Sequence, residues 1–200
     1  MCLTIGLLAA CSNANDPYAK IEGGPLIPAT LHAVTLVSDA PGLTERLQAA
    51  GYAPITLAPN YQAAIHVESV LWDVPEEAAG KVTVLKGPAG APDLRVLVTP
   101  LHPAAPAADA GVLQSFYRNV LGTDVPQWPQ NVARADNVRV QVWTFFIVDV
   151  LDANRKLRAH TIPALSEPVG ITTSYLGDEK TMTLRAPDGA IVELVQAAAQ

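Results

Sequence analysis

The side chains of this chain best suited to chemistry are a few histidines and glutamates in apolar, strand-like segments. His32 lies in HAVTLVSD, His66 and Glu68 lie two residues apart in IHVESVLW, and Glu193 lies in the closing run AIVELVQ. Imidazole nitrogens and carboxylate oxygens bind divalent metals, and a carboxylate can also act as a general base. The candidate chemistry is therefore metal-assisted or acid–base catalysis.

The composition excludes several other kinds of chemistry. Both cysteines, Cys2 and Cys11, lie at the N-terminus, so the rest of the chain has no cysteine nucleophile, cysteine ligand or disulfide. The 200 residues carry a net charge of −6 with a pI near 5.1, and an acidic protein without a basic patch is a poor nucleic-acid binder. The sequence has no phosphate-binding loop, nucleophile elbow or dinucleotide fingerprint.

The elements that position these residues form an approximate internal repeat. Residues 31–51 read LHAVTLVSDAPGLTERLQAAG, and residues 141–159 read QVWTFFIVDVLDANRKLRA. In each copy an apolar, β-branched run ends at an aspartate, Asp39 or Asp149, that we expect to cap the next helix. Internal repetition of this kind predicts two similar modules that bury their sheets together.

Each copy of the repeat continues into further strand-like runs. Turn residues separate three such runs in each half of the chain. The predicted strands after the first helix are 64–72, 81–86 and 94–101, and those after the second helix are 168–175, 181–185 and 191–196. Each half therefore has the order strand, helix, three strands.

The chain is expected to divide into four consecutive parts that make a single two-module domain with a leader. The bridge between the modules contains an apolar segment, 112–121, that predicts a helix. The four parts are a leader and tether at 1–30, a first βαβββ module at 31–101, a bridging loop and helix at 102–136, and a second βαβββ module at 137–200.

Two βαβββ modules closed by the phrase LRAPDGAIVELVQ resemble the vicinal oxygen chelate superfamily. That group includes glyoxalase I, extradiol dioxygenases, and fosfomycin-resistance and bleomycin-binding proteins. The resemblance covers about residues 31–196, and HAVTLVSD and the last strand at 181–196 are its most specific parts. FYRNVLG is also familiar, although here it lies in the bridge. The resemblance implies an α+β fold in which two βαβββ modules form a cupped mixed β-sheet site with helices outside.

The resemblance also implies a divalent metal in the cup, namely Zn²⁺, Ni²⁺, Mn²⁺ or Fe²⁺. Its ligands come from the first and last strands of each module, and His32 and Glu193 match two of these four positions. The other two fall on Val142 and on Val96 or Val98, none of which can bind a metal. Glu193 is also the candidate catalytic base.

Two ligands are few for a catalytic ion, which normally has three protein ligands and one open position. His66 and Glu68 are candidates for a third ligand, because alternate residues of a strand face the same side. The alternative is structural, with His32 a satisfied histidine near a sheet edge and Glu193 a solvated residue or an ion-pair partner.

The cup can also bind a small molecule without a metal. If Val142 faces inward, the two-residue period of a strand turns Thr144 and Phe146 inward and packs Trp143 and Phe145 against the helix. A largely apolar pocket with a few polar groups is typical of small-ligand sites, although the same aromatic residues could simply be core. The candidate ligand-binding residues are Thr144, Phe146, Tyr175 and Trp72.

The first residues resemble the leader of a bacterial lipoprotein. The apolar run 1–10 ends in Leu-Ala-Ala, directly before Cys11, which the resemblance implies is lipidated. Residues 12–28 would then be a tether, and the protein would lie in the bacterial cell envelope, facing the periplasm. The alternative is an apolar terminus of a cytoplasmic protein. Ten residues are too few to span a bilayer.

Three functions follow from these observations. The first is a metal-dependent lyase or dioxygenase of the glyoxalase type that uses His32 and Glu193. The second is a metal-free protein that binds a small molecule in the cup, as bleomycin-resistance proteins do. The third is a non-catalytic interaction lipoprotein of the envelope, because a fold alone does not determine function. A small-molecule ligand is the expected partner, a homodimer is left open, and the lipid anchor is the only membrane contact.

Overall fold

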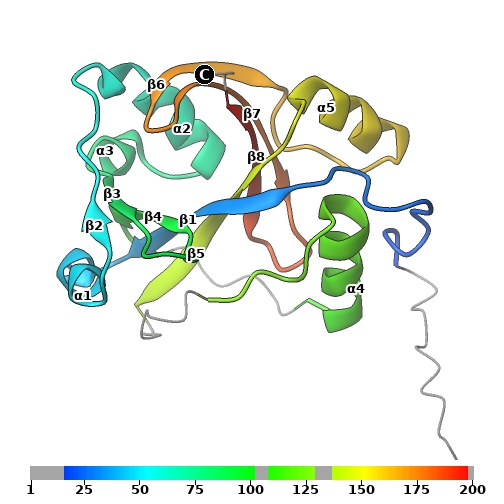
Figure 1. Ribbon diagram of the computed structural model, residues 1–200, viewed down its shortest axis with the longest axis horizontal. Coiled ribbons are helices and arrows are strands. Elements are labelled where there is room, and N and C mark those ends of the chain that lie inside the picture. The colour runs from blue at the N-terminus through cyan, green and yellow to red at the C-terminus, as the bar shows by residue number, and fades with distance from the viewer. Residues whose placement is uncertain (1–15, 102–107, 129–136, 198–200) are drawn as a thin grey trace, which may run out of the picture.

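A single curled, mixed β-sheet forms the centre of the molecule (Figure 1). The computed structural model describes residues 16–101, 108–128 and 137–197. The eight strands lie side by side in the order β2-β3-β4-β1-β5-β8-β7-β6. Their bounds are β1 Thr30–Ser38, β2 Ala53–Pro54, β3 Thr83–Lys86, β4 Asp93–Val98, β5 Val138–Phe146, β6 Val169–Ser174, β7 Gly177–Arg185 and β8 Ile191–Ala197.

The strand pairings repeat on the two sides of the sheet. β1 pairs with β4 in parallel and β5 pairs with β8 in parallel, while β1 and β5 meet antiparallel at the centre. In each half the remaining two strands extend the sheet outward in antiparallel pairs. The fold is therefore α+β, with two βαβββ modules in one cupped sheet, as the internal repeat predicts.

The helices cover both faces of the sheet. Figure 1 shows α2 and α3 together on the opposite side of the molecule from α4. Among the described residues, no helix is both long enough and apolar enough to cross a membrane. The helices are α1 Leu43–Ala49, the short 3₁₀ helix η1 Tyr61–Ala63, α2 Ile65–Trp72, α3 Glu76–Ala79, α4 Ala110–Ser115, the π-helix η2 Phe116–Leu121 and α5 Val150–Ala159.

One predicted strand is wrong, because residues 64–72 form helix α2 instead. Leu71 and four other residues of α2 are buried, and those four, Ile65, Glu68, Ser69 and Trp72, follow the spacing i, i+3, i+4, i+7 of one helix face. The second strand of the first module is instead the two-residue β2, which directly follows α1. The other predicted strands and the bridge helix over 112–121 are confirmed.

The two aspartates of the repeat behave differently. The Asp149 carboxylate accepts hydrogen bonds from the amides of Leu151 and Asp152, so it caps α5 as expected. The prediction for Asp39 is wrong, because α1 begins after Gly42 and no side chain caps it. Gly42 has a φ of 93°, which places the chain in a left-handed turn before the helix.

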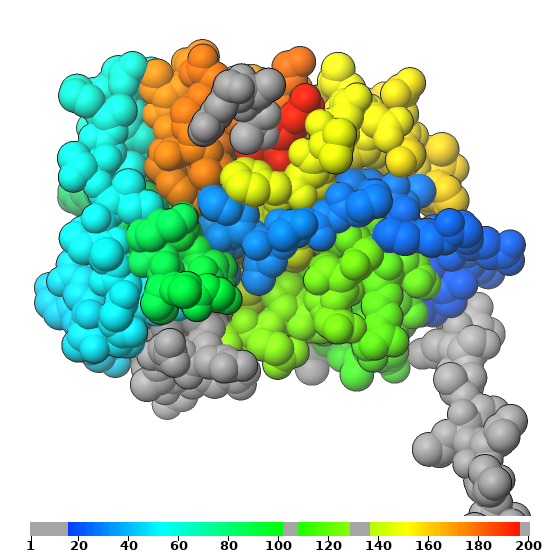
Figure 2. All heavy atoms as spheres, viewed as in Figure 1, coloured from blue at the N-terminus to red at the C-terminus, as the bar shows by residue number. Residues whose placement is uncertain are grey.

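The chain before β1 packs along the bridge helix. The amides of Leu26, Ile27 and Ala29 donate hydrogen bonds to backbone carbonyls at the C-terminal end of η2, at 2.7–3.0 Å. In Figure 2 the blue atoms of this segment lie directly against the green atoms of α4 and η2. Backbone groups that the π-helix leaves unpaired are satisfied in this way.

The sheet separates two apolar clusters, which identify its faces. Trp143, Phe145 and the α5 residues Val150, Ala153 and Leu157 belong to the cluster on the outer face. Val142 belongs to the cluster on the other face, together with residues of α2 and α3. We call this second face the cup face, and we call η1, α2 and α3 its roof. The predicted alternation along 142–146 is confirmed.

Candidate functional site

Three polar side chains from three strands near the centre of the sheet form the floor of the cup. They are Arg95 of β4, Thr144 of β5 and Glu193 of β8, and all are buried. The Nη2 atom of Arg95 lies 2.7 Å from Oε2 of Glu193, and the Thr144 hydroxyl donates to the same oxygen at 2.7 Å. Arg95 also contacts the Thr144 hydroxyl. We call Arg95, Thr144 and Glu193 the floor.

The roof reaches the floor through Trp72, the last residue of α2. Its indole Nε1 donates a hydrogen bond to Oε1 of Glu193 at 3.0 Å. The guanidinium carbon of Arg95 lies 4.3 Å from the centre of the indole ring, in the geometry of a cation–π contact. Trp72 is fully buried, and its indole lies against the floor.

The floor ion pair is buried, and the contact between its two opposite charges stabilises it there. Burial by itself lowers the pKa of the Arg95 guanidinium, but the adjacent Glu193 carboxylate more than offsets this and the pKa is raised above its ordinary value. Arg95 therefore keeps its positive charge. Each oxygen of Glu193 has a donor, which is the condition under which a buried carboxylate is tolerated.

Two further carboxyl groups lie close enough to interact electrostatically with this ion pair. Glu68 of α2 accepts a hydrogen bond from the Tyr61 hydroxyl, and burial raises its pKa to about 7. Glu179 of β7 accepts one from the Ser174 hydroxyl, and burial together with the Glu193 charge raises its pKa to about 8. Both groups thus hold their protons into the neutral range, which limits the negative charge inside the cup.

His32 lies at the mouth of the cup, where the pairing of β1 with β5 shifts register between Leu31 and Ala33. Such irregularities re-aim a side chain, and here the imidazole stacks on Phe146 at 4.0 Å between ring centres. Its Nε2 atom is buried without a hydrogen bond and lies 3.8 Å from Oδ2 of Asp93. Burial lowers the pKa of His32, so the ring is mainly neutral near pH 7.

An open pocket of about 390 Å³ adjoins this histidine. Lys86 and Asp93 form an ion pair in its wall, at 3.1 Å. The Tyr175 ring lies 6.3 Å from the His32 ring and 5.7 Å from the guanidinium carbon of Arg95. It therefore connects the pocket beside His32 with the floor. The lining residues are Leu31, His32, Lys86, Gly90, Ala91, Pro92 and Asp93.

The structure separates the two candidates for a third metal ligand. Because 64–72 is a helix, His66 and Glu68 do not share a side as they would on a strand. The His66 side chain is 77% exposed and its Nδ1 lies 3.1 Å from Glu76, whereas Glu68 is only 1% exposed and faces Tyr61. His66 therefore cannot join Glu68 at one ion.

The donor set does not fit a divalent metal. Within the residues that the structure describes, no group of three or more His, Cys, Asp or Glu side chains is placed to hold an ion. Both oxygens of Glu193 are already bonded, to Trp72 on one side and to Arg95 and Thr144 on the other. A guanidinium supplies the positive charge that a metal would bring to this carboxylate.

Arg95 is the main residue of the candidate site that sequence reasoning missed. The resemblance put the corresponding position of the first module on Val96 or Val98, but Val96 packs on the outer face and Val98 is exposed. The signal was available in the strand DLRVLV, where a single arginine interrupts a buried apolar run and so requires a partner. Tyr61 and Glu179 were missed as well, with no comparable signal.

The four candidate ligand-binding residues all lie on the cup side. Trp72 and Thr144 are bonded to Glu193, Phe146 stacks on His32 at the mouth, and the Tyr175 hydroxyl is buried without a partner. Trp72 and Thr144 are fully buried beneath the roof, whereas Phe146 and Tyr175 are only partly buried.

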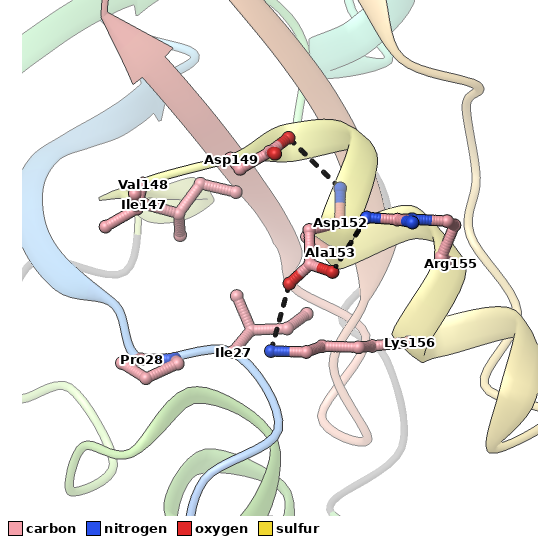
Figure 3. Close-up of a pocket in the computed structure, with 9 residues that line it drawn as sticks. All are labelled: Ile27, Pro28, Ile147, Val148, Asp149, Asp152, Ala153, Arg155 and Lys156. Atoms are coloured by element: carbon pink, nitrogen blue, oxygen red, sulfur yellow. Dashed lines mark hydrogen bonds and ion pairs between the residues drawn. The ribbon is translucent and has the colours of Figure 1, made fainter.

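A second pocket, of about 250 Å³, lies outside the cup at the start of α5 (Figure 3). Asp149 points back to the helix amides, and Asp152 is paired with Arg155 and Lys156 at 3.0–3.1 Å. These charged groups satisfy one another within the helix, so the cup remains the better candidate site.

Comparisons with known proteins do not assign this chain to a family. No family model matches the chain, and no curated protein matches it. Similar solved structures include methylmalonyl-CoA epimerase from Mycobacterium tuberculosis, 12% identical with a TM-score of 0.48, covering 90% of this chain and 95% of that one.

Two other solved structures have weaker scores. A glyoxalase/bleomycin resistance protein/dioxygenase superfamily member from Vibrio splendidus is 10% identical with a TM-score of 0.39, covering 84% of this chain and 100% of that one. Lactoylglutathione lyase from Agrobacterium tumefaciens is 14% identical with a TM-score of 0.23, covering 84% and 94%. Because all these TM-scores are below 0.5, the fold is assigned from the strand order and pairings of this chain.

Proposed function

We propose that the protein binds a small organic molecule in the cup between its two modules, without a metal ion. The observation that carries the proposal is the occupation of both Glu193 oxygens by Arg95, Thr144 and Trp72. A lyase or dioxygenase that polarises its substrate with a metal needs open coordination positions on that ion. The floor instead offers a fixed guanidinium and a fixed carboxylate as recognition groups.

The pocket beside His32 supports this proposal as the point of entry. It is open to solvent, it is lined by the mainly neutral imidazole and the Lys86–Asp93 pair, and Tyr175 links it to the floor. Its volume of about 390 Å³ falls within the range of small-ligand sites. Aromatic surfaces beside a few directed polar groups favour a ligand with a flat, apolar part.

The proposal is tested by screening metabolite-sized compounds for stabilisation of the protein in excess EDTA, followed by titration calorimetry of each compound that binds. We expect the same affinity in EDTA as in added Zn²⁺, Ni²⁺, Mn²⁺ or Fe²⁺. His32→Ala should weaken binding, whereas His160→Ala, an exposed histidine at the end of α5, should not. Binding that requires one of these metals would overturn the proposal.

A further inference from the structure

We infer that the indole of Trp72 occupies the position of the ligand, and that the ligand is therefore a flat aromatic ring with an N–H donor on its edge. This inference rests on the proposed function. The floor contacts Trp72 in two ways: Arg95 lies against the face of the ring, and Glu193 accepts its N–H. Together these contacts recognise an electron-rich ring and one donor at a fixed position.

The contacts that hold the floor together do not involve the indole. Oε2 of Glu193 is held by Arg95 and Thr144, which are contributed by β4 and β5, while Glu193 belongs to β8. Only Oε1 depends on Trp72. If the indole leaves, the sheet presents a preformed acceptor beside a preformed cation, and groups already fixed in place lose little entropy when a ligand binds.

The cup side also contains buried polar atoms that Trp72 does not satisfy. Nε of Arg95 and the hydroxyl oxygens of Thr35, Tyr175 and Thr181 are buried without a hydrogen bond. Thr35 pairs with Arg95 across β1 and β4, and Thr181 lies two residues from Thr183, which pairs with Glu193. Buried polar groups are normally bonded, so this cluster indicates a ligand with more polar atoms than an indole.

The roof is a structure of the first module. η1, α2 and α3 lie in the connection between β2 and β3, whereas in the second module Tyr175 and Leu176 alone connect β6 to β7. The polar contacts between roof and sheet include Trp72 to Glu193, the Gln141 amide to the Trp72 carbonyl at 2.8 Å, and the Thr173 hydroxyl to the Asn60 carbonyl at 3.0 Å. Asp73, with a φ of 53°, ends α2 in a left-handed turn beside these contacts. An outward movement of α2 therefore takes Trp72 off the floor.

The ligand class is tested with Trp72→Ala in the full chain, with indole and benzofuran as probes. The two probes have nearly the same shape, but benzofuran has an oxygen in place of the N–H group. We expect indole to raise the melting temperature of the variant and to bind at about one equivalent, at least about tenfold more tightly than benzofuran, since a hydrogen bond to a charged group is lost in the second case.

The control is Trp143→Ala, which removes a buried tryptophan from the outer face of the same sheet. Its cavity contains neither Arg95 nor Glu193, so indole should have no advantage over benzofuran there. Equal binding of the two probes by Trp72→Ala would overturn the ligand class. If Trp72→Ala does not fold, Trp72→Phe retains a ring but lacks the donor, and it should bind indole more tightly than the native protein does. No such gain in Trp72→Phe would contradict the inference.

The movement of the roof is tested in the native protein by hydrogen exchange. Saturating indole should speed exchange of the α2 amides, and Glu193→Gln should reduce this effect. If indole does not bind and exchange of the α2 amides is unchanged, Trp72 stays on the floor permanently, and the inference is overturned. Metal-independent binding of a different class of compound would still leave the proposed function standing, whereas binding that needs a metal would remove both.

Discussion

At the scale of single residues, the main feature of the cup is the buried ion pair between Arg95 and Glu193. Removing two such charges from water is costly, and the pair is tolerated because the charges contact each other and both oxygens of Glu193 accept hydrogen bonds. Well-packed apolar residues could fill the same space, so an ion pair maintained at the centre of the cup is consistent with recognition of polar groups.

Arg95→Met should destabilise the protein strongly. The variant leaves the Glu193 carboxylate buried without its cation, and breaking such a pair costs about 3–5 kcal/mol. Urea unfolding measures the loss. Arg118→Met is the matched control, because Arg118 pairs with Asp124 on the surface, and its effect should be small. A similar effect of the two variants would contradict the interpretation of the floor.

Glu68 should make the protein less stable as the pH rises. Its pKa is about 7 in the folded protein against an ordinary value of 4.5, so between these values the folded state holds a proton that the unfolded state has lost. The unfolding free energy therefore falls from about pH 4.5 to pH 7 and the penalty persists above that. Glu179, with a pKa of about 8, acts in the same direction up to a higher pH.

Glu68→Gln should remove part of this pH dependence. A glutamine can still accept the Tyr61 hydrogen bond but does not titrate, so the variant should match the native protein near pH 5 and exceed its stability at pH 8 by an amount on the order of 2 kcal/mol. Denaturant unfolding across this range gives the comparison, with the exposed Glu45→Gln as control. Parallel pH profiles for native protein and Glu68→Gln would count against the buried position of this carboxyl.

Part of the site could be predicted from single residues. The placement of Thr144 and Phe146 on the cup side follows from strand periodicity, whereas Trp72 reaches the cup from a helix that was predicted to be a strand. The pairing of Arg95 with Glu193 could not be derived, because the two lie 98 residues apart and meet only through the strand order β4-β1-β5-β8. The lone arginine in DLRVLV indicates a buried partner but does not identify it.

At the scale of elements, the two copies of the repeat share a strand and a helix but differ at the helix start. Asp149→Ala should lower the melting temperature by a few degrees, because it removes the two hydrogen bonds that cap α5. Asp39→Ala should have almost no effect, since α1 has no side-chain cap. Calorimetry on both variants gives the comparison, and equal effects would mean that the copies are capped alike.

The elements were largely predictable where one face of a strand or helix is buried. The strands β3 to β8 and the helix α5 follow from periodicity, and the error at 64–72 has a physical cause. IHVESVLW is rich in residues that favour strands, but its burial follows helical spacing because it lies across the cup instead of extending the sheet. The position of this segment in the fold outweighed its local preference for a strand. As a result His66, a candidate metal ligand, lies on the surface.

At the scale of the whole molecule, the predicted lipid anchor at Cys11 lies outside the described residues, and envelope localisation stays a prediction. Expressed in bacteria from its authentic start, the protein should fractionate with membranes, and Cys11→Ser should release it. One acyl chain binds membranes only marginally, so stable retention depends on the several chains that the resemblance to lipoproteins implies. Membrane retention of Cys11→Ser would contradict lipidation at this residue.

The two modules also differ as wholes, since only the first has a roof over the shared cup. The central claim is that Arg95 supplies the positive charge of this cup, so that ligand binding needs no metal. The direct measurement is elemental analysis of the purified protein after incubation with Zn²⁺, Ni²⁺, Mn²⁺ and Fe²⁺ and removal of the excess. We predict far less than one metal ion per chain, with the same value for Glu193→Gln. One equivalent of metal in the native protein, lost in both Glu193→Gln and His32→Ala, would contradict the claim.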